Sequence, residues 1–482
     1  MLKALRLMVV ATLVFGLAGS GHAASLRQVG PQASAAEIIA AHGALSGPVL
    51  RLTYASPDAA KIVATLGTDY IFVRESGSKD HHRASLADFA LKREMGLDEA
   101  GKSFSNLSLY AMADFRYAES YNRRMLRRML SEAKVAGAPL HPYFDQQEVG
   151  VVSPEDGTVE FTKVRTATGG LKFVVEGKLA AAFEPSTESL SPGEVQALSR
   201  FLRHNFTLHP EMIAAILASK AAPKEIVFLT GTFGARTERH WQLQSVERTV
   251  ASYPLTADYR SDLRSSAIAS KEPLKTLLPV MLEAIAGRYR NGPRSLDSFR
   301  SAEDEALAKG HMMQAFLLDN ERGLQYRSGV LACFSGNVLH EDCSRRQEII
   351  ERWKADAPTM ALMQSFGLER SAPKEAIAQR NRIDRSGLES VYILDLWNAD
   401  TILQTGVEGD APALFALAIK GNPYVGGFYK DLGDVFRTGF QPDAAWLCYD
   451  LARLLPGGEG APVVDGLARM EAAIETRTPE FF

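Results

Sequence analysis

The chain has 482 residues, of which 46% are hydrophobic and 23% are charged, a balance typical of a globular protein of roughly two or three domains. Its 54 basic and 57 acidic side chains give a net charge of −3, so it lacks the strong basic excess that a nucleic-acid partner favours. We therefore predict a folded protein with no nucleic-acid partner.

The first 23 residues have the parts of a secretory signal peptide. Lys3 and Arg6 form a basic region, residues 7–18 are an apolar run, and small residues lead to a cleavage site after Ala23. The apolar run is shorter than the roughly 20 residues of a membrane-spanning helix. We expect an exported, periplasmic or secreted protein, whose mature net charge is about −5 once Lys3 and Arg6 are removed.

Between residues 24 and 265, strand-like runs alternate with helical patterns, which predicts a mixed α/β domain. The stretch ATGG at 167–170 predicts a hairpin turn, because glycine accepts the positive φ of tight turns. Ser191 and Pro192 predict a helix start, since serine caps helices and proline suits the first helical position. Runs rich in β-branched and aromatic residues predict strands that begin at Val49, Asp69, Val159, Leu171 and Glu225.

A helical pattern over residues 106–135 carries a cluster of arginines. Like charges spaced i,i+4 are mildly unfavourable unless anions compensate for them. Glu119 and Glu132 provide such anions on the same helix, which favours a locally paired surface. The alternative is an anion-binding patch for anionic lipid headgroups or an acidic partner. The cluster consists of Arg123, Arg124, Arg127 and Arg128.

No catalytic motif names a reaction: HExxH, GxSxG, a Walker loop and a GxGxxG after a strand are all missing. Adjacent His81 and His82 rarely hold a metal without ligands from elsewhere, so neither a metal nor a cofactor is expected. His204 and His209, at predicted helix ends, are interpreted as structural. If the α/β domain carries an active site, then His81, His82 or His240 are its candidate members.

Three cysteines remain after the signal peptide. Cys333 and Cys343 flank a short polar stretch that a disulfide can close, and the predicted exported location is oxidising, so we predict that they pair. The alternative is two reduced, buried thiols. Cys448 stands among apolar residues of a predicted helix and is interpreted as core.

From residue 266 to residue 482, helix follows helix with short connections, which predicts an all-helical domain. A shift of 34 residues aligns residues 440–457 with residues 406–423. The units 392–425 and 426–459 therefore resemble tetratricopeptide repeats. The second unit carries the family's consensus at Tyr429, Leu432, Gly433, Phe436, Ala445, Tyr449 and Ala452; the first departs from it at Asp395 and Asn398.

The resemblance implies that the first helix of each unit faces a binding groove. It implies groove positions at Leu396, Trp397, Asp400 and Leu403, then at Lys430, Asp431, Asp434 and Arg437. From these we predict a partner-binding site formed by Trp397, Asp400, Lys430, Asp434 and Arg437. The alternative is that Trp397 packs against a neighbouring helix and the charges form a solvated face.

Two functions follow from these patterns. The first is an exported protein-interaction or scaffold protein that binds a protein or peptide partner in the cell envelope through the predicted groove. The alternative is a cell-envelope hydrolase whose active site lies in the α/β domain. Overall, the sequence predicts an α+β protein with an N-terminal α/β domain and a helical C-terminal domain.

Overall fold

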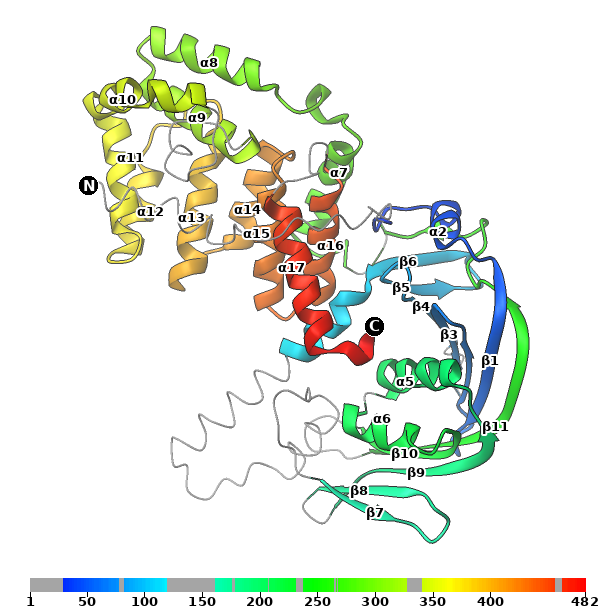
Figure 1. The fold of residues 1–482 in the computed structure, drawn as a ribbon. Coiled ribbons are helices and arrows are strands. Elements are labelled where there is room, and N and C mark those ends of the chain that lie inside the picture. Colours follow the sequence, from blue (N-terminus) through cyan, green and yellow to red (C-terminus); the bar gives the residue numbers. More distant parts are fainter. Residues whose placement is uncertain are drawn as a thin grey trace, which may run out of the picture. The chain divides into compact units, whose positions relative to one another are not determined.

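The computed structural model describes residues 29–77, 82–118, 161–175, 178–206, 208–230, 237–263, 266, 268–326, 340–455 and 462–482. The chain forms two compact units (Figure 1). One is a sheet-rich unit made of Ser25–Leu263 with Arg469–Phe482, and the other is a helical unit, Arg264–Ala468. A sheet-rich N-terminal region followed by a region of many helices confirms the predicted α+β class.

The described part of the sheet-rich unit contains one twelve-stranded sheet, in the order β12-β6-β5-β4-β3-β2-β1-β11-β10-β9-β8-β7. Neighbouring strands are antiparallel, except for β6 and β12, which are parallel. The strands are β1 (Ser46–Ala55), β2 (Lys61–Leu66), β3 (Tyr70–Ser76), β4 (His82–Asp88), β5 (Arg93–Asp98), β6 (Ser103–Ser108), β7 (Thr162–Arg165), β8 (Leu171–Val175), β9 (Lys178–Ser189), β10 (Ala221–Thr230), β11 (Thr237–Ser252) and β12 (Arg260–Ser261).

Helices cover both faces of this sheet. Figure 1 shows the sheet curving around α5 (Pro192–Phe206) and α6 (Pro210–Leu217), and Leu198 and Phe201 of α5 are fully buried in the core on that face. On the other face, Ile38 of α2 (Ala35–His42) enters a second core. Each sheet face therefore packs its own apolar side chains against a helix.

Local signals explain several of these elements. Ser191 and Glu194 form a reciprocal cap at the start of α5: the Ser191 amide donates to Glu194 Oε2 at 2.7 Å, and the Glu194 amide donates to Ser191 Oγ at 3.4 Å. The predicted turn at 167–170 joins β7 to β8, with Gly169 at φ 86°. Both predictions are confirmed.

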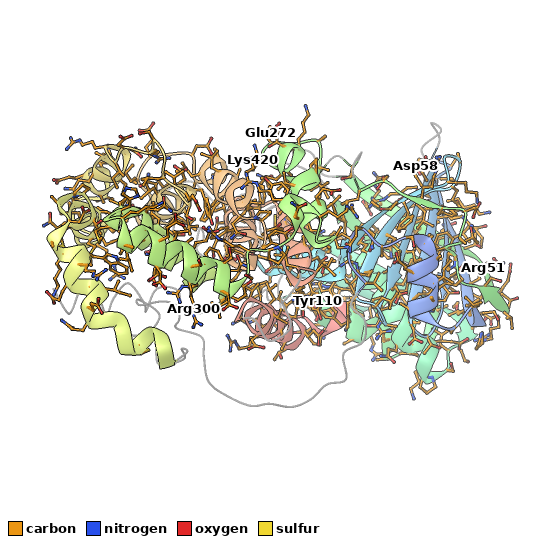
Figure 2. All side chains as sticks on the ribbon, turned by 90° about the horizontal axis from the view of Figure 1, so that it is seen from above. Arg51, Asp58, Tyr110, Glu272, Arg300 and Lys420 are labelled. Carbon is orange, nitrogen blue, oxygen red and sulfur yellow. The ribbon has the colours of Figure 1, made fainter. Side chains whose placement is uncertain are left out.

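Partly exposed charged side chains form ion pairs on and beside the central strands. Arg51 of β1 pairs with Glu247 of β11 at 3.6 Å, and Asp58, in the turn after β1, pairs with Arg239 at 3.6 Å (Figure 2). The side chains of Arg51 and Asp58 are 39% and 59% exposed, so these pairs contribute little to stability.

The helical unit is built from consecutive helices that pack in pairs, notably α8 with α9, α11 with α12, α13 with α14 and α15 with α16. Its helices are α7 (Leu274–Ile285), α8 (Leu296–Ala308), α9 (Met312–Tyr326), α10 (His340–Ala355), α11 (Ala357–Leu368), α12 (Pro373–Asn381), α13 (Tyr392–Thr405), α14 (Ala411–Gly421), α15 (Gly426–Thr438), α16 (Pro442–Arg453) and the first part of α17 (Pro462–Arg477).

The two predicted units have matching geometry. Helices α13 and α15 begin 34 residues apart, at Tyr392 and Gly426. Gly406 and Phe440, also 34 residues apart, both adopt positive φ in the connections after these helices, at 67° and 56°. Gly433 lies directly against the Tyr449 ring, which leaves no room for a Cβ atom and lets α15 and α16 approach closely.

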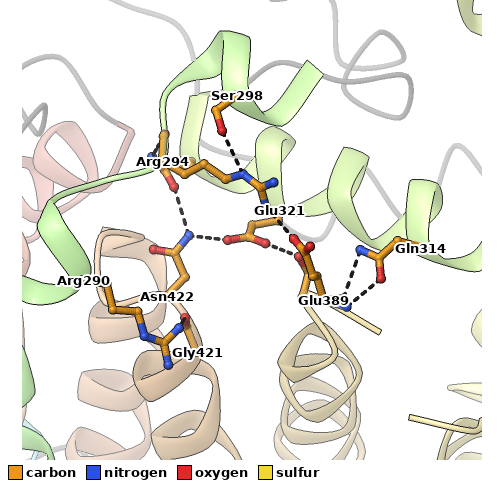
Figure 3. A network of polar contacts seen from close by, with 10 residues as sticks. Arg290, Arg294, Ser298, Gln314, Glu321, Glu389, Gly421 and Asn422 are labelled. Carbon is orange, nitrogen blue, oxygen red and sulfur yellow. Dashed lines mark hydrogen bonds and ion pairs between the residues drawn. The ribbon is translucent and has the colours of Figure 1, made fainter. Parts of the chain in front are cut away.

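A polar network fixes the α13–α14 pair to α9 (Figure 3). Glu321 of α9 accepts hydrogen bonds from Asn422 Nδ2, at the end of α14, at 2.7 Å, and from Ser390 Oγ, just before α13. Arg294, before α8, pairs with Glu389 at 2.9 Å. Glu321 is 7% exposed, so these bonds are sheltered from water.

Candidate partner-binding face

The five predicted partner-binding residues lie on α13 and α15. Trp397 and Asp400 are on α13, and Lys430, Asp434 and Arg437 are on α15. We call these five residues, together with Asp431, the α13–α15 face. All six side chains are partly exposed.

Trp397 is anchored on one side by neighbouring helices. Its ring meets Phe366 of α11 edge-on at 4.8 Å and Phe316 of α9 at 6.2 Å. This packing agrees with the alternative that Trp397 supports the helix stack. Trp397 is still partly exposed, so its contact with a partner stays a prediction.

A buried arginine that the sequence analysis did not identify organises this region. Arg380 of α12 is 0% exposed and donates to Trp397 O at 3.0 Å, Thr401 Oγ1 at 2.8 Å and Ser365 Oγ at 3.0 Å. Its guanidinium also pairs with Glu369. Arg380 therefore joins α11, α12 and α13, and its charge is matched inside the protein.

On α15 the charges are largely matched as well. Lys430 Nζ lies 2.5 Å from Asp434 Oδ2, and the Tyr449 hydroxyl donates to Asp434 Oδ1 at 2.7 Å. Asp434 and Asp400 occupy equivalent positions of the two units, but only Asp434 has such partners. The equivalence in sequence therefore does not extend to the electrostatics.

Asp400 and Asp431 stand out because, within the described ranges, neither has a hydrogen bond or an ion pair. Burial raises the pKa of Asp400 well above its ordinary value, and the nearby charges of Asp431 and Glu369 raise it further. Burial also raises the pKa of Asp431, to about 7. The charges of Arg380 and Lys430 offset part of the rise for Asp400, and Lys430 offsets part of it for Asp431. The face thus holds two recessed carboxyl groups that, among the described residues, have no direct ion pair when ionised.

Of the three hydrolase candidates in the sheet-rich unit, the two that the structure describes lie on separate strands. His81 lies outside the described residues, and His82 begins β4, which β3, β2 and β1 separate from the β11 strand of His240. His240 is exposed and has Glu238 at 3.2 Å and Glu225 at 4.0 Å. This surface pairing gives no sign of a shared active site.

A different histidine in this unit does meet an acid. His42 Nδ1 lies 2.9 Å from Asp88 Oδ2, which also accepts a 2.7 Å hydrogen bond from the Tyr253 hydroxyl. The His42 ring stacks on Tyr253 at 4.1 Å, and its side chain is only 3% exposed. No motif near His42 could have indicated this contact, because its partners are distant in sequence. The enclosed cluster ties the end of α2 to β4.

The arginine cluster at Arg123, Arg124, Arg127 and Arg128 lies wholly outside the described residues. The predicted disulfide lies partly outside them, because Cys333 is not described. Both stay predictions. Cys448 is a free and fully buried thiol in α16, in agreement with its predicted place in the core.

No protein-family model, curated protein or solved structure matches this chain. Across the described residues, no three His, Cys, Asp or Glu side chains are grouped so that they could hold a metal ion. None of the described helices combines the length and the apolar character needed to cross a membrane. Conclusions about function therefore rest on the geometry of the chain itself.

Proposed function

We propose that this chain is an exported protein-interaction or scaffold protein whose α13–α15 face binds a basic segment of a partner protein in the cell envelope. The 34-residue spacing of α13 and α15 supports this reading, because it agrees with the resemblance to tetratricopeptide repeats. In that family the corresponding first helices line the binding groove.

The observation that carries the proposal is the pair of unmatched carboxyl groups, Asp400 and Asp431. Recessed carboxylates without a partner cost folding free energy, and groups with strongly shifted pKa values are frequent at functional sites. A lysine or arginine side chain of a partner would supply the missing counter-charge to both groups. We therefore expect the face to bind a cationic group rather than an anionic one.

The neighbouring charges support the same choice of partner. Glu369 is matched by Arg380, and Asp434 by Lys430, so these four residues leave no unmatched charge of their own. Asp400 and Asp431 add two carboxylates against one further cation, Arg437, so the six residues of the face carry a net charge of −1 when both are ionised. Charge complementarity of this kind selects partners and speeds their association.

A defined probe tests the proposal: a short fluorescent peptide of alternating arginine and alanine, compared with its glutamate counterpart. We expect the wild-type protein to bind the arginine peptide and the Asp400→Asn/Asp431→Asn double variant to bind it at least about tenfold more weakly. Asp443→Asn, which removes a carboxyl from α16, is the matched control and should keep wild-type affinity. Undiminished binding by a folded double variant would rule out this face.

The alternative, a cell-envelope hydrolase, draws on one observation, the contact between His42 and Asp88. A carboxylate in contact with an imidazole is one element of general-base catalysis. Hydrolase screening of the wild-type protein and of His42→Gln tests it. Ester or amide hydrolysis that depends on His42 would favour the enzyme over the interaction protein.

A further inference from the structure

Residues 478–482 of the sheet-rich unit lie against α5 and the strand ends beside it (Figure 1). We call them the C-terminal segment; it includes the short 3-10 helix η4 (Pro479–Phe481). The side chains that receive it form what we call the α5 cradle. The cradle consists of Lys92, Tyr110, Arg200, Arg203 and His204.

The middle of the segment is held by a carboxylate and an aromatic ring. Glu480 Oε1 lies 3.3 Å from Arg203 Nη2, and the Arg203 side chain is only 1% exposed. The Arg203 guanidinium also lies over the Phe481 ring at 4.6 Å, and His204 meets that ring edge-on at 5.3 Å. Phe481 is 1% exposed, so the cradle takes up the whole ring.

The last residue makes a second set of contacts. Arg200 Nε donates to the main-chain oxygen of Phe482 at 2.8 Å. Lys92 Nζ lies 4.7 Å from the centre of the Phe482 ring, and the Tyr110 ring (Figure 2) lies 5.0 Å from it. Cations over aromatic faces and tilted aromatic pairs are both attractive arrangements.

The charge of the cradle explains why it accepts a carboxylate. Arg200, Arg203 and His204 lie within about one turn of α5, so their side chains are neighbours. Burial lowers the pKa of Arg203 to about 10 and that of His204 to about 4. A carboxylate beside Arg203 compensates for part of this cost, and Glu480 provides it.

The segment is attached without strand pairing in the described sheet, and Thr478, at φ −133° and ψ 55°, separates it from the helical conformation of α17. Pro479 is exposed, and Glu480 and Phe482 are partly exposed. The segment is therefore held by cradle side chains, of which Arg200 and His204 contact the main-chain oxygens of Phe482 and Phe481. The Thr478 amide and hydroxyl both donate to Ile474 O, which ties the start of the segment to α17.

We propose that the α5 cradle is a docking site for short peptide segments in which a carboxylate precedes two aromatic residues. The chain's own C-terminal segment closes the site until a partner with a segment of this kind competes for it. This inference is independent of the α13–α15 face, since it uses none of its residues.

A labelled peptide with the sequence of residues 476–482 tests the proposal on the full chain. In the variant Glu480→Ala/Phe481→Ala/Phe482→Ala, the cradle is intact but its own segment can no longer fill it. We expect this variant to bind the peptide at least tenfold more tightly than the wild-type protein does. A peptide with lysine in place of glutamate and alanines in place of both phenylalanines should not bind.

The site is located by a second substitution in the same background. Adding Lys92→Ala with Arg200→Ala should abolish peptide binding, whereas adding Lys163→Ala, a cation over Phe161 elsewhere in the unit, should not. Equal binding by wild type and triple variant, or none by a folded triple variant, would overturn the proposal. If the triple variant fails to fold, the single variants Glu480→Gln and Phe482→Ala replace it. The proposal would then be overturned if neither single variant bound the peptide more tightly than the wild-type protein does.

Discussion

At the scale of single residues, Gly406 and Phe440 show how one backbone position is filled in two ways. Both adopt positive φ between paired helices, although phenylalanine is unfavourable in this region and its ring is 51% exposed. We expect Phe440→Gly to raise the free energy of unfolding by about 1 kcal/mol, because glycine has no Cβ to strain. Urea unfolding measures this. Gly406→Ala, which meets no neighbouring atom, should lower stability by a similar amount; a gain there would contradict the explanation.

Gly433 is required for a different reason, namely the space available. A Cβ atom there would collide with the Tyr449 ring and lie 3.1 Å from Ala445 O, so Gly433→Ala should cost about 1–3 kcal/mol. The control is Gly466→Ala in α17, where a Cβ meets nothing within 4 Å. That change should stabilise the protein by roughly 0.5–1 kcal/mol, because alanine has the higher helix propensity. Thermal unfolding of both variants distinguishes a collision from a general effect of glycine replacement.

His209 makes stability depend on pH. Its Nδ1 accepts a 3.1 Å hydrogen bond from the Glu211 amide at the start of α6, and burial lowers its pKa from 6.5 to about 4. Because the unfolded state binds the proton more tightly, this residue's contribution is complete above pH 6.5 and is lost as the pH falls towards 4. The loss at pH 5 should be about 2 kcal/mol. His209→Asn keeps a capping side chain without this titration, so its unfolding free energy should fall less between pH 7.5 and pH 5.

At the scale of elements, the predicted runs from Val49, Asp69, Val159, Leu171 and Glu225 overlap β1, β3, β7, β8 and β10, whereas the sequence does not predict β11. Val49, Leu171 and Glu225 lie in or begin apolar stretches that form β1, β8 and β10. In β11, buried Trp241 and exposed Gln242 alternate, but charged residues along this long strand hide the pattern from sequence analysis. Residues 106–108 were expected to be helical and instead belong to β6, because pairing with β5 overrides local propensity.

The α11–α12–α13 arrangement depends on Arg380, and this gives a prediction for the elements that it joins. Arg380→Ala should lower the free energy of unfolding by about 3–5 kcal/mol, because it leaves Glu369 without its counter-charge and Trp397 O without its donor. Arg382→Ala, in the exposed residue that follows α12, should change stability by less than about 0.5 kcal/mol. Chemical unfolding compares the two. Similar small effects would contradict the role given to Arg380.

The sequence predicts the position of the candidate face but not the ion pairs within it. The 34-residue alignment placed Trp397, Asp400, Lys430, Asp434 and Arg437 on two corresponding helices, where they lie. It could not reveal that Asp434 is matched by Lys430 while Asp400 is unmatched, because that depends on rotamers and on Arg380 from another helix. Periodicity fixes which face a residue occupies but not its electrostatic partners.

At the scale of the whole molecule, the predicted helical domain ran to residue 482, whereas Arg469–Phe482 cluster with the sheet-rich unit. The predicted helix in this stretch is confirmed, since α17 extends to Arg477. Its assignment depends on contacts with residues far away in sequence, such as Arg203 with Glu480 and Tyr110 with Glu475. Local patterns carry no information on such contacts.

Partner binding itself should respond to pH if the proposed function is right. With its pKa raised to about 7, Asp431 is mostly neutral at pH 6 and mostly ionised at pH 8. The affinity for the arginine peptide should therefore rise by about tenfold over this range, since only the ionised carboxyl attracts the cation. Asp431→Asn should bind more weakly and show a smaller change with pH. A wild-type affinity that is constant from pH 6 to pH 8 would contradict this mechanism, and fluorescence anisotropy measures it.

The position of β1 in the sheet also determines the order in which the fold can be completed. Ser46 of β1 pairs with Ser252 of β11, and among the described strands none that precedes β11 in the sequence occupies that edge of β1. While the chain is being synthesised, β1 to β6 can form their antiparallel hairpins, but β1 keeps an open edge until about two hundred residues later. Open strand edges recruit other chains. We therefore expect a nascent or truncated chain that stops before β11 to be more prone to aggregation than the complete chain.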